Sequence, residues 1–282
     1  MGHKLPNRNS LNIGKIVYIF LALFWFFITA FPLYFTLVSS LKTDNEIWGT
    51  MFQLPKNPQW ENYLTIFKSS NIVRAIGNSL ILSLGSVAIM MLCVIMSSYV
   101  LARKLIKGAP TIQTYLTLAL MIPLQGAVVP IVQMVGSIGG KNNFFILMLI
   151  YVGLNISTAS FIMISYISGI SHEIDEAAMI DGCNLFQIVF RIILPISMPA
   201  VATSAIVGFL NVYNELAIAN VIMTKSENMT VSAALLSFKG DYQVELRLIF
   251  ASIVIIIIPI MVFYLLCQEK VEQGLAAGSV KG

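Results

Sequence analysis

The feature that most constrains this 282-residue chain is the spacing of its charged side chains. Six stretches between consecutive Asp, Glu, Lys or Arg residues are 21 to 33 residues long. A helix needs about 20 mostly apolar residues to cross a hydrocarbon core. Because lipid offers no partners to backbone amides and carbonyls, a spanning segment must satisfy its own, as a helix does. The sequence therefore predicts six transmembrane helices, over residues 16–38, 77–101, 112–134, 144–168, 195–222 and 248–268.

The fold class that follows is an all-α membrane protein, a polytopic bundle of six transmembrane helices with a helical cytoplasmic loop. Only 11% of the residues are charged, whereas soluble domains average about 25%. This composition excludes a soluble domain, a disordered tail and a nucleic-acid-binding protein. The three scattered cysteines form neither a disulfide framework nor a metal site. Prolines inside the spans predict kinks, at Pro32, Pro123, Pro130, Pro199 and Pro259.

The short loops set the expected orientation, because Lys and Arg concentrate on the cytoplasmic side. Three basic residues precede the first span, and three more lie between the second and third spans, whereas the next loop has only Lys141. We therefore expect a multi-pass protein of the cytoplasmic (inner) membrane with both termini cytoplasmic. The predicted divisions are the N-terminus, first helix and outer loop, a five-helix domain, and a cytoplasmic tail, over residues 1–72, 73–268 and 269–282.

The cytoplasmic loop at 169–200 is unusually acidic, since its N-terminal half holds four carboxylates. Ser171 is placed to cap a helix, and Gly182 suits the left-handed residue that ends one. Asn184 with Gln187 resembles a capping box that opens a second helix. Anionic inner leaflets attract basic segments rather than acidic ones. The pattern therefore predicts two short helices that dock into a groove on a cytoplasmic protein, instead of lying on the bilayer.

Three segments carry a resemblance to a known family. Residues 176–182 read Glu-Ala-Ala-x-x-Asp-Gly and are followed by Leu-Pro at 194–195 and by Pro199. This stretch resembles the EAA motif of ABC importer permeases, in the carbohydrate-uptake group related to the maltose permeases. Asn78-Ser79-Leu80 is similar to the start of the shared transmembrane domain, and residues 274–282 to the terminus of that group. Tyr213 departs from the pattern, because relatives often have Trp before Asn214.

The resemblance implies a type I importer domain over 73–268, with an EAA loop at 169–194 that acts as the coupling helix. The implied partners are a second permease (a heterodimer), two ATPase subunits, an extracellular solute-binding protein, a sugar and membrane lipid. ATP and Mg would bind the ATPases, and this chain would carry no cofactor. The expected substrate is an oligosaccharide, with glycerol phosphate or a polyol as the alternative. The implied coupling residues are Glu176, Ala177, Ala178, Asp181 and Gly182.

Each of these residues has an expected role in coupling. Glu176 would make a polar contact with the ATPase, Gly182 would form the turn, and the two alanines would permit close approach. Asp181 would either join this contact or brace its own loop.

The residues argue against other function classes. A P-loop needs Gly-Lys followed by Ser or Thr, but the two Gly-Lys pairs here precede Ile16 and Asn142. The nucleotide must therefore bind another chain. A membrane enzyme would need reactive groups inside the bilayer, and five of the six spans have no ionisable Asp, Glu, Lys, Arg or His. An ion-coupled carrier would need a relay of such groups, and Glu215 is the one acidic residue within a span.

The fifth span supplies candidate residues for the substrate path: Asn211, Tyr213, Asn214 and Glu215. An ionised side chain at a helix centre costs about 3 kcal/mol, so Glu215 should face protein or water. At 100° per residue, Asn211, Asn214 and Glu215 share one helix face, while Tyr213 points elsewhere. Two interpretations stay open. The face either lines a path and binds sugar hydroxyls, or it hydrogen-bonds to a neighbouring helix.

Overall fold

A computed structural model describes residues 13–69, 71–236 and 245–279. Every regular element in these ranges is a helix, as the sequence predicts. In chain order they are α1 (Ile13–Ser40), α2 (Asp44–Gly49), α3 (Glu61–Ser69), α4 (Ile72–Ala102), α5 (Ala109–Ala119), α6 (Leu124–Ser137), α7 (Phe144–Ile167), α8 (His172–Ile180), α9 (Leu185–Gln187), the π-helix η1 (Ile188–Ile193), α10 (Leu194–Ile196), α11 (Met198–Tyr213), α12 (Ala217–Ile222), the 3-10 turn η2 (Ser226–Asn228), α13 (Val231–Leu236) and α14 (Leu246–Ser279).

Four helices in the described part of the chain are long and apolar enough to cross a membrane by themselves: α1, α4, α7 and α14. The first residue of each of these helices lies within a few residues of the first residue of a predicted span. Two further candidates are bent pairs, and counting each pair as one span raises the number to six. Charge spacing predicts four of the membrane helices correctly, but it predicts as continuous the two spans that the structure shows as bent pairs.

The third predicted span, 112–134, is not one kinked helix. It consists of α5 and α6, which meet at 100°. Pro123 lies at the break with an extended backbone (φ −69°, ψ 132°). Proline lacks an N–H and disfavours helical geometry in the residue before it. The helix therefore ends before Pro123, and the chain restarts in a new direction.

The fifth predicted span, 195–222, is also wrong as a single helix. The helical segment Leu185–Ile196 meets α11 at 78°. At the other end, α11 stops at Tyr213 and a separate helix, α12, begins at Ala217. The residues between them include Glu215, whose carboxylate accepts hydrogen bonds from backbone amides of α12. This side chain caps α12, so the second helix starts afresh.

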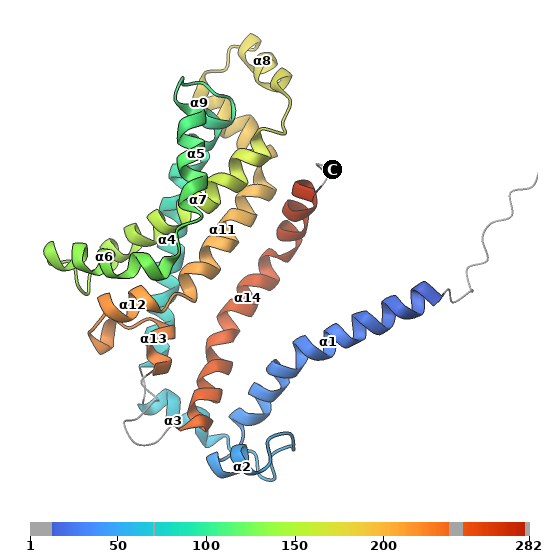
Figure 1. Ribbon diagram of the computed structural model, residues 1–282, viewed down its shortest axis with the longest axis vertical. Coiled ribbons are helices and arrows are strands. Elements are labelled where there is room, and N and C mark those ends of the chain that lie inside the picture. Colours follow the sequence, from blue (N-terminus) through green and yellow to red (C-terminus); the bar gives the residue numbers. More distant parts are fainter. Residues whose placement is uncertain (1–12, 70, 237–244, 280–282) are drawn as a thin grey trace, which may run out of the picture.

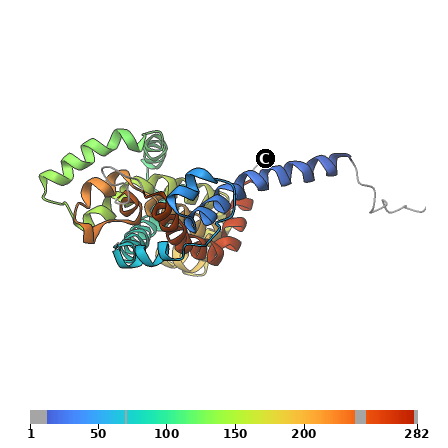
Figure 2. The ribbon, with the colours of Figure 1, turned by 90° about the horizontal axis from the view of Figure 1, so that it is seen from below.

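The bundle is built around α4, which packs against α7 and α11, while α14 packs along α11. Figure 1 shows these helices side by side, with α8 at one end of the bundle and α2 and α3 at the other. Seen from below in Figure 2, α1 and α6 extend away from the bundle in opposite directions. Three apolar clusters form the core, one near α8, one between α11 and α14, and one between α7 and α12.

Helix α1 leaves the bundle over most of its length (Figure 1). Only its C-terminal part contacts α14, where the rings of Phe35 and Phe250 meet edge to face at 5.3 Å. None of the side chains in its most hydrophobic window is buried. Aromatic side chains such as Trp25, 67% exposed, therefore face the membrane or another chain rather than this one.

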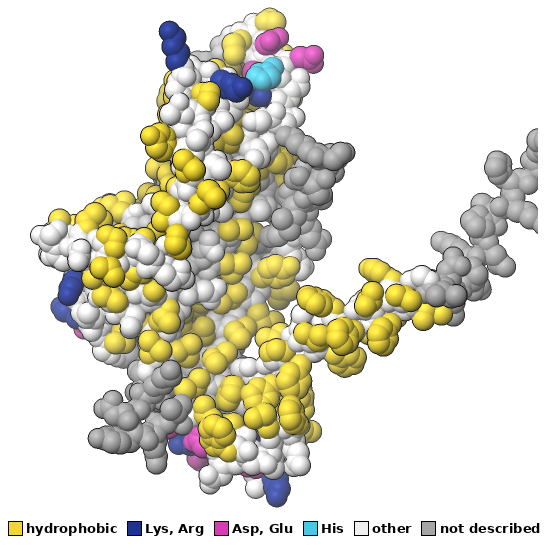
Figure 3. Space-filling view, viewed as in Figure 1, with side chains coloured by type: hydrophobic (Ala, Val, Ile, Leu, Met, Phe, Trp, Pro, Cys, Tyr) yellow, Lys and Arg dark blue, Asp and Glu magenta, His cyan; other side chains and the backbone are white. Residues whose placement is uncertain are grey.

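Charged side chains gather at the two ends of the molecule and beneath α6, and the rest of this face shows hydrophobic and uncharged groups (Figure 3). This distribution fits a bilayer across the middle of the bundle. Residues 1–12 and 280–282 lie outside the described residues, so the basic N-terminus and the last part of the terminal resemblance are not seen. Most of the predicted tail, 269–282, continues α14 to Ser279.

Candidate functional site

Helix α8 begins and ends at the residues that the sequence indicates. Ser171 precedes it, and the Ser171 hydroxyl accepts a hydrogen bond from the backbone N–H of Glu173 (3.3 Å). At the other end, Gly182 has φ +81°. The backbone N–H of Cys183 donates to the carbonyl of Ala178 (2.9 Å), and that of Gly182 donates to Met179 (3.0 Å). These two bonds define a Schellman turn, which requires the left-handed conformation that glycine adopts at little cost.

The second half of the loop also follows the sequence prediction. Asn184 and Gln187 form the predicted capping box, in which each side chain accepts a hydrogen bond from the other's backbone N–H (3.0 and 2.8 Å). The helix that follows runs through a π-helical turn, η1, to Ile196. Together α8, the Gly182 turn and this second helix form a helical hairpin over residues 172–196, the loop hairpin.

The predicted coupling residues do not all face the same way. Glu176, Ala177, Asp181 and Gly182 are exposed on the loop hairpin. Ala178, in contrast, is 4% exposed and belongs to the apolar cluster around η1. Its small side chain permits close approach of α8 to its own chain, and in this structure it is not on the outward face of the loop hairpin. The carboxylate of Asp181 makes no hydrogen bond or ion pair within the described ranges, so bracing of its own loop is not seen there.

The outward face of α8 carries apolar side chains beside its charges. Ile180 is 86% exposed and Met179 is 55% exposed. Helix α8 lies at one end of the bundle (Figure 1), and charged side chains gather at that end (Figure 3). Exposed apolar side chains rimmed by polar groups mark protein interaction sites. The tip of α8 is therefore suited to contact with another protein.

An ion pair that the sequence analysis did not identify holds α8 to the bundle. Asp175 on α8 pairs with Arg103, the residue that caps the C-terminus of α4, with Nε and Oδ2 2.5 Å apart. The two side chains are 6% and 2% exposed. The Arg103 guanidinium also donates to the carbonyl of Ile170 at 2.9 Å. Spacing along the sequence gave no signal for this contact between two distant segments.

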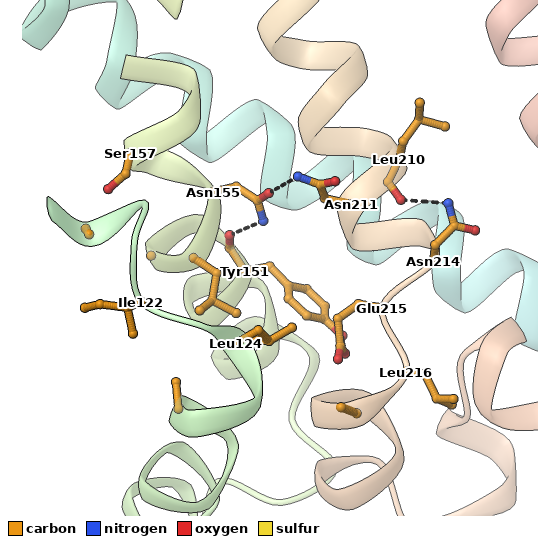
Figure 4. A pocket seen from close by; sticks show the side chains of 15 residues that line it. Ile122, Leu124, Tyr151, Asn155, Ser157, Leu210, Asn211, Asn214, Glu215 and Leu216 are labelled. Atoms are coloured by element: carbon orange, nitrogen blue, oxygen red, sulfur yellow. Dashed lines mark hydrogen bonds between the residues drawn. The ribbon is translucent and has the colours of Figure 1, made fainter. Parts of the chain in front are cut away.

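A second candidate site is a cavity of about 750 Å³ between α5, α6, α7 and the break after α11. Three of the four predicted path residues line it, and they are joined by polar side chains of α7 (Figure 4). The polar lining consists of Tyr151, Asn155, Ser157, Asn211, Asn214 and Glu215. The remaining lining residues are mostly apolar. A concave, largely apolar site with a few convergent polar groups is typical of small-molecule binding.

The asparagines of the cavity form a short chain of hydrogen bonds. Asn211 Nδ2 donates to Asn155 Oδ1 (3.0 Å), and Asn155 Nδ2 donates to the Tyr151 carbonyl (2.9 Å) (Figure 4). Asn214 Nδ2 donates to the Leu210 carbonyl of its own helix (2.9 Å). Within the described residues, Asn211 and Asn214 use only their amide nitrogens in these bonds. Their side-chain oxygens can therefore accept hydrogen bonds from a molecule in the cavity.

Glu215 is 9% exposed, and three donors hold its carboxylate. Oε2 accepts from the Tyr151 hydroxyl (2.8 Å) and from the Ala219 N–H (3.0 Å), while Oε1 accepts from the Ile218 N–H (2.8 Å). The carboxylate lies at the positive end of α12, where negative charge is favoured. This geometry supports the structural interpretation of Glu215, in which it holds α7 and α12 together.

Tyr213 does not line the cavity. It is 1% exposed and lies in the apolar cluster between α11 and α14, where its ring stacks on Phe209 at 5.6 Å. Its hydroxyl donates to the Ile256 carbonyl (3.4 Å). Tyr213 therefore lies apart from the other three predicted path residues, as expected from the helix, on which it points away from Asn211.

The sequence of the chain matches a known family of transport proteins. The family described as "Binding-protein-dependent transport system inner membrane component" matches residues 94–277, which include the loop hairpin and the cavity residues. The chain is a member of this family. It is accordingly a permease subunit of an ABC transporter, a multi-pass component of the inner membrane and not an enzyme.

Individual relatives match over nearly the whole chain. It is 30% identical over 275 residues to the "Probable starch degradation products transport system permease protein AmyC" of Thermoanaerobacterium thermosulfurigenes, covering 96% of this chain and 99% of AmyC. It is 30% identical over 259 residues to the "Galactooligosaccharides transport system permease protein GanQ" of Bacillus subtilis (strain 168), covering 90% and 91%.

Among solved structures, a bacterial ABC transporter involved in the import of the acidic polysaccharide alginate contains a chain with the same fold. The TM-score is 0.80 at 19% identity, and the match covers 95% of this chain and 99% of that one.

Proposed function

We propose that this permease subunit imports an oligosaccharide, with the loop hairpin as its contact to an ATPase subunit and the cavity as part of the sugar path. The observation that supports the docking role best is the tip of α8. Ile180 and Met179 are exposed there at a charged end of the molecule, beside the acidic side chain of Glu176. An apolar tip flanked by the exposed carboxylates of Glu176 and Asp181 suits a groove on a soluble partner.

The orientation in this proposal follows from the basic residues near α8. Arg103, Lys104 and Lys107 follow α4 directly, and Arg103 contacts α8. Basic short loops face the cytoplasm, so the end with α8 is assigned to the cytoplasmic side. The C-terminal end of α14 points toward the same end (Figure 1). The ATPases, with their ATP and Mg, would bind there, and the solute-binding protein would bind at the end with α2 and α3.

The sugar assignment is supported by AmyC and GanQ, whose names give starch degradation products and galactooligosaccharides as cargo. The volume of the cavity, about 750 Å³, lies within the roughly 300–1,000 Å³ of small-molecule sites. Its amide oxygens accept the hydrogen bonds that sugar hydroxyls donate. A second permease would close the open side of this path, and α1, with its unburied aromatic side chains, is available to contact it.

The docking role is tested by Ile180→Asp, with Trp48→Asp as the matched control. Trp48 lies on α2 at the opposite end and is 74% exposed. We expect Ile180→Asp to reduce co-purification of the ATPase subunits, because an aspartate must be desolvated in an apolar groove. Trp48→Asp should leave co-purification unchanged. Normal recovery of the ATPases with Ile180→Asp would contradict the docking role.

The substrate class is tested by uptake in cells that lack the gene, with and without the restored chain. Labelled maltotriose, a galactotriose and glycerol 3-phosphate are the probes. We expect uptake of an oligosaccharide to depend on the chain. Dependence of glycerol phosphate uptake alone would show that the sugar assignment is wrong.

A further inference from the structure

The attachment of α8 to the membrane helices is concentrated on one guanidinium group. Arg103 pairs with Asp175, and its Nη1 and Nη2 donate to the carbonyls of Ile170 (2.9 Å) and Ser171 (3.5 Å). One side chain at the end of α4 therefore holds the first turn of α8 and the two residues before it. Lysine cannot reproduce these contacts, because it presents a point charge instead of a planar fork.

The other attachment of α8 is apolar. Ala178 packs into the cluster that contains Ile188 and Val189 of η1. The Schellman turn then connects α8 to α9 through the chain itself. Among the described elements, η1 is the one that α8 contacts most. The direct polar link from α8 to the long spanning helices is therefore the Arg103–Asp175 pair.

Helix α4 leads from this link to the walls of the cavity. It packs along α7, which carries Tyr151 and Asn155, and along α11, which carries Asn211. A buried ion pair is weak evidence for stability, because the desolvation of both charges offsets much of their attraction. Such pairs are better suited to fixing one arrangement of two elements. A pair between α8 and α4 therefore fixes the position of one helix relative to the other.

We propose that Arg103 and Asp175 are positioning residues that transmit displacement of α8 to α4, and through α4 to the cavity between α7 and α11. The inference rests on the proposed docking of an ATPase subunit on α8. Breaking the pair should leave the ATPase bound, because the tip residues Met179 and Ile180 are untouched. It should remove the response of the cavity to ATP.

The test uses the assembled transporter in proteoliposomes, with serine at all native cysteine positions and a reporter cysteine, Leu216→Cys. Leu216 lines the cavity and is 37% exposed. The rate at which an impermeant maleimide modifies it is measured with and without ATP and vanadate. With the pair intact, we expect ATP and vanadate to change this rate by about fivefold or more, the lower range of allosteric coupling. Co-purification of the ATPases and their hydrolysis rate are measured in parallel.

Four variants separate positioning from folding. Asp175→Asn and Arg103→Lys should keep the ATPases bound but reduce the change in rate to less than about twofold. Asp175→Glu, which preserves the charge pair, should restore it. Glu173→Gln is the matched control, because Glu173 is an exposed acid on the same turn of α8. It should behave as the parent does.

Arg103→Lys decides the case if Asp175→Asn does not assemble, because lysine leaves no uncompensated charge. A full fivefold response in Arg103→Lys would overturn the proposal, and so would loss of ATPase binding in step with loss of response. The Ile180→Asp variant tests the proposed function separately. If it co-purifies with the ATPase subunits as well as the parent transporter does, the docking of an ATPase on α8 is contradicted, whatever the Arg103 and Asp175 variants show.

Discussion

Removal of the Glu215 carboxylate should destabilise the junction between α7 and α12. Glu215→Ala leaves three donors without their acceptor: the Tyr151 hydroxyl and the backbone amides of Ile218 and Ala219. Hydrogen bonds in membrane proteins average about 0.6 kcal/mol, and those to charged groups in proteins begin near 1.5 kcal/mol. Three bonds therefore stabilise the fold by about 2–4.5 kcal/mol.

Glu215→Gln gives a graded comparison. With its amide oxygen in the position of Oε2, glutamine still accepts from Tyr151 and Ala219, but its NH2 group then faces the Ile218 N–H, so that bond is lost and two donors meet. The expected loss is about 0.6–1.5 kcal/mol for the bond plus the cost of the facing donors, and it stays below that of Glu215→Ala because two bonds remain. Asn214→Ala is the matched neighbour, because the Asn214 side chain is exposed and donates to its own helix. Its effect should lie within about 0.5 kcal/mol.

The assay is thermal stability in detergent. A fluorescent fusion is heated, and the fraction that remains monodisperse on size exclusion gives a midpoint for each variant. We expect the order parent, Asn214→Ala, Glu215→Gln and Glu215→Ala, from most to least stable. A Glu215→Ala variant as stable as the parent, but altered in uptake of the transported sugar, would refute the structural interpretation and assign the carboxylate to the sugar path.

Three further outcomes follow from the geometry. Gly182→Val should lower ATPase co-purification, because the left-handed conformation costs a side-chain-bearing residue about 1–2 kcal/mol, whereas Gly182→Asn should be tolerated; equal recovery for both would contradict the role of the turn. In a cysteine-free background, Asn57→Cys should react with an impermeant reagent from outside intact cells and Lys107→Cys should not, and the reverse pattern would invert the orientation. Asn211→Leu should reduce sugar uptake while assembly persists; unchanged uptake kinetics would place the path elsewhere.

The sequence was most informative where the physics is local. Ser171, Gly182 and the Asn184–Gln187 pair each act on backbone groups a few residues away, so both ends of α8 and the start of α9 could be predicted. The uncharged stretches located α1, α4, α7 and α14 for a related reason, since length and apolarity are sufficient to identify a span. These features need no knowledge of distant parts of the chain.

Contacts between distant segments could not be predicted in this way. An uncharged stretch gives the length of a segment and not its direction, so the sequence predicts a kink at Pro123 where the structure has a 100° bend. The sequence predicts Glu215 inside a helix, because nothing near it indicates that its carboxylate caps α12. Asp175 looks like its neighbours Glu173 and Glu176 in the sequence, and its burial depends on Arg103, which reaches it from the end of α4.

The central claim, that the loop hairpin docks on an ATPase subunit, is tested most directly by site-specific photo-crosslinking in intact membranes. A photoreactive amino acid is introduced at Ile180 on the tip of α8, and in a separate chain at Trp48 on α2. We expect illumination to join the Ile180 chain to an ATPase subunit, and the Trp48 chain to give no such product. Absence of the ATPase product from Ile180 in an assembled, active transporter, or its formation from Trp48, would contradict the account.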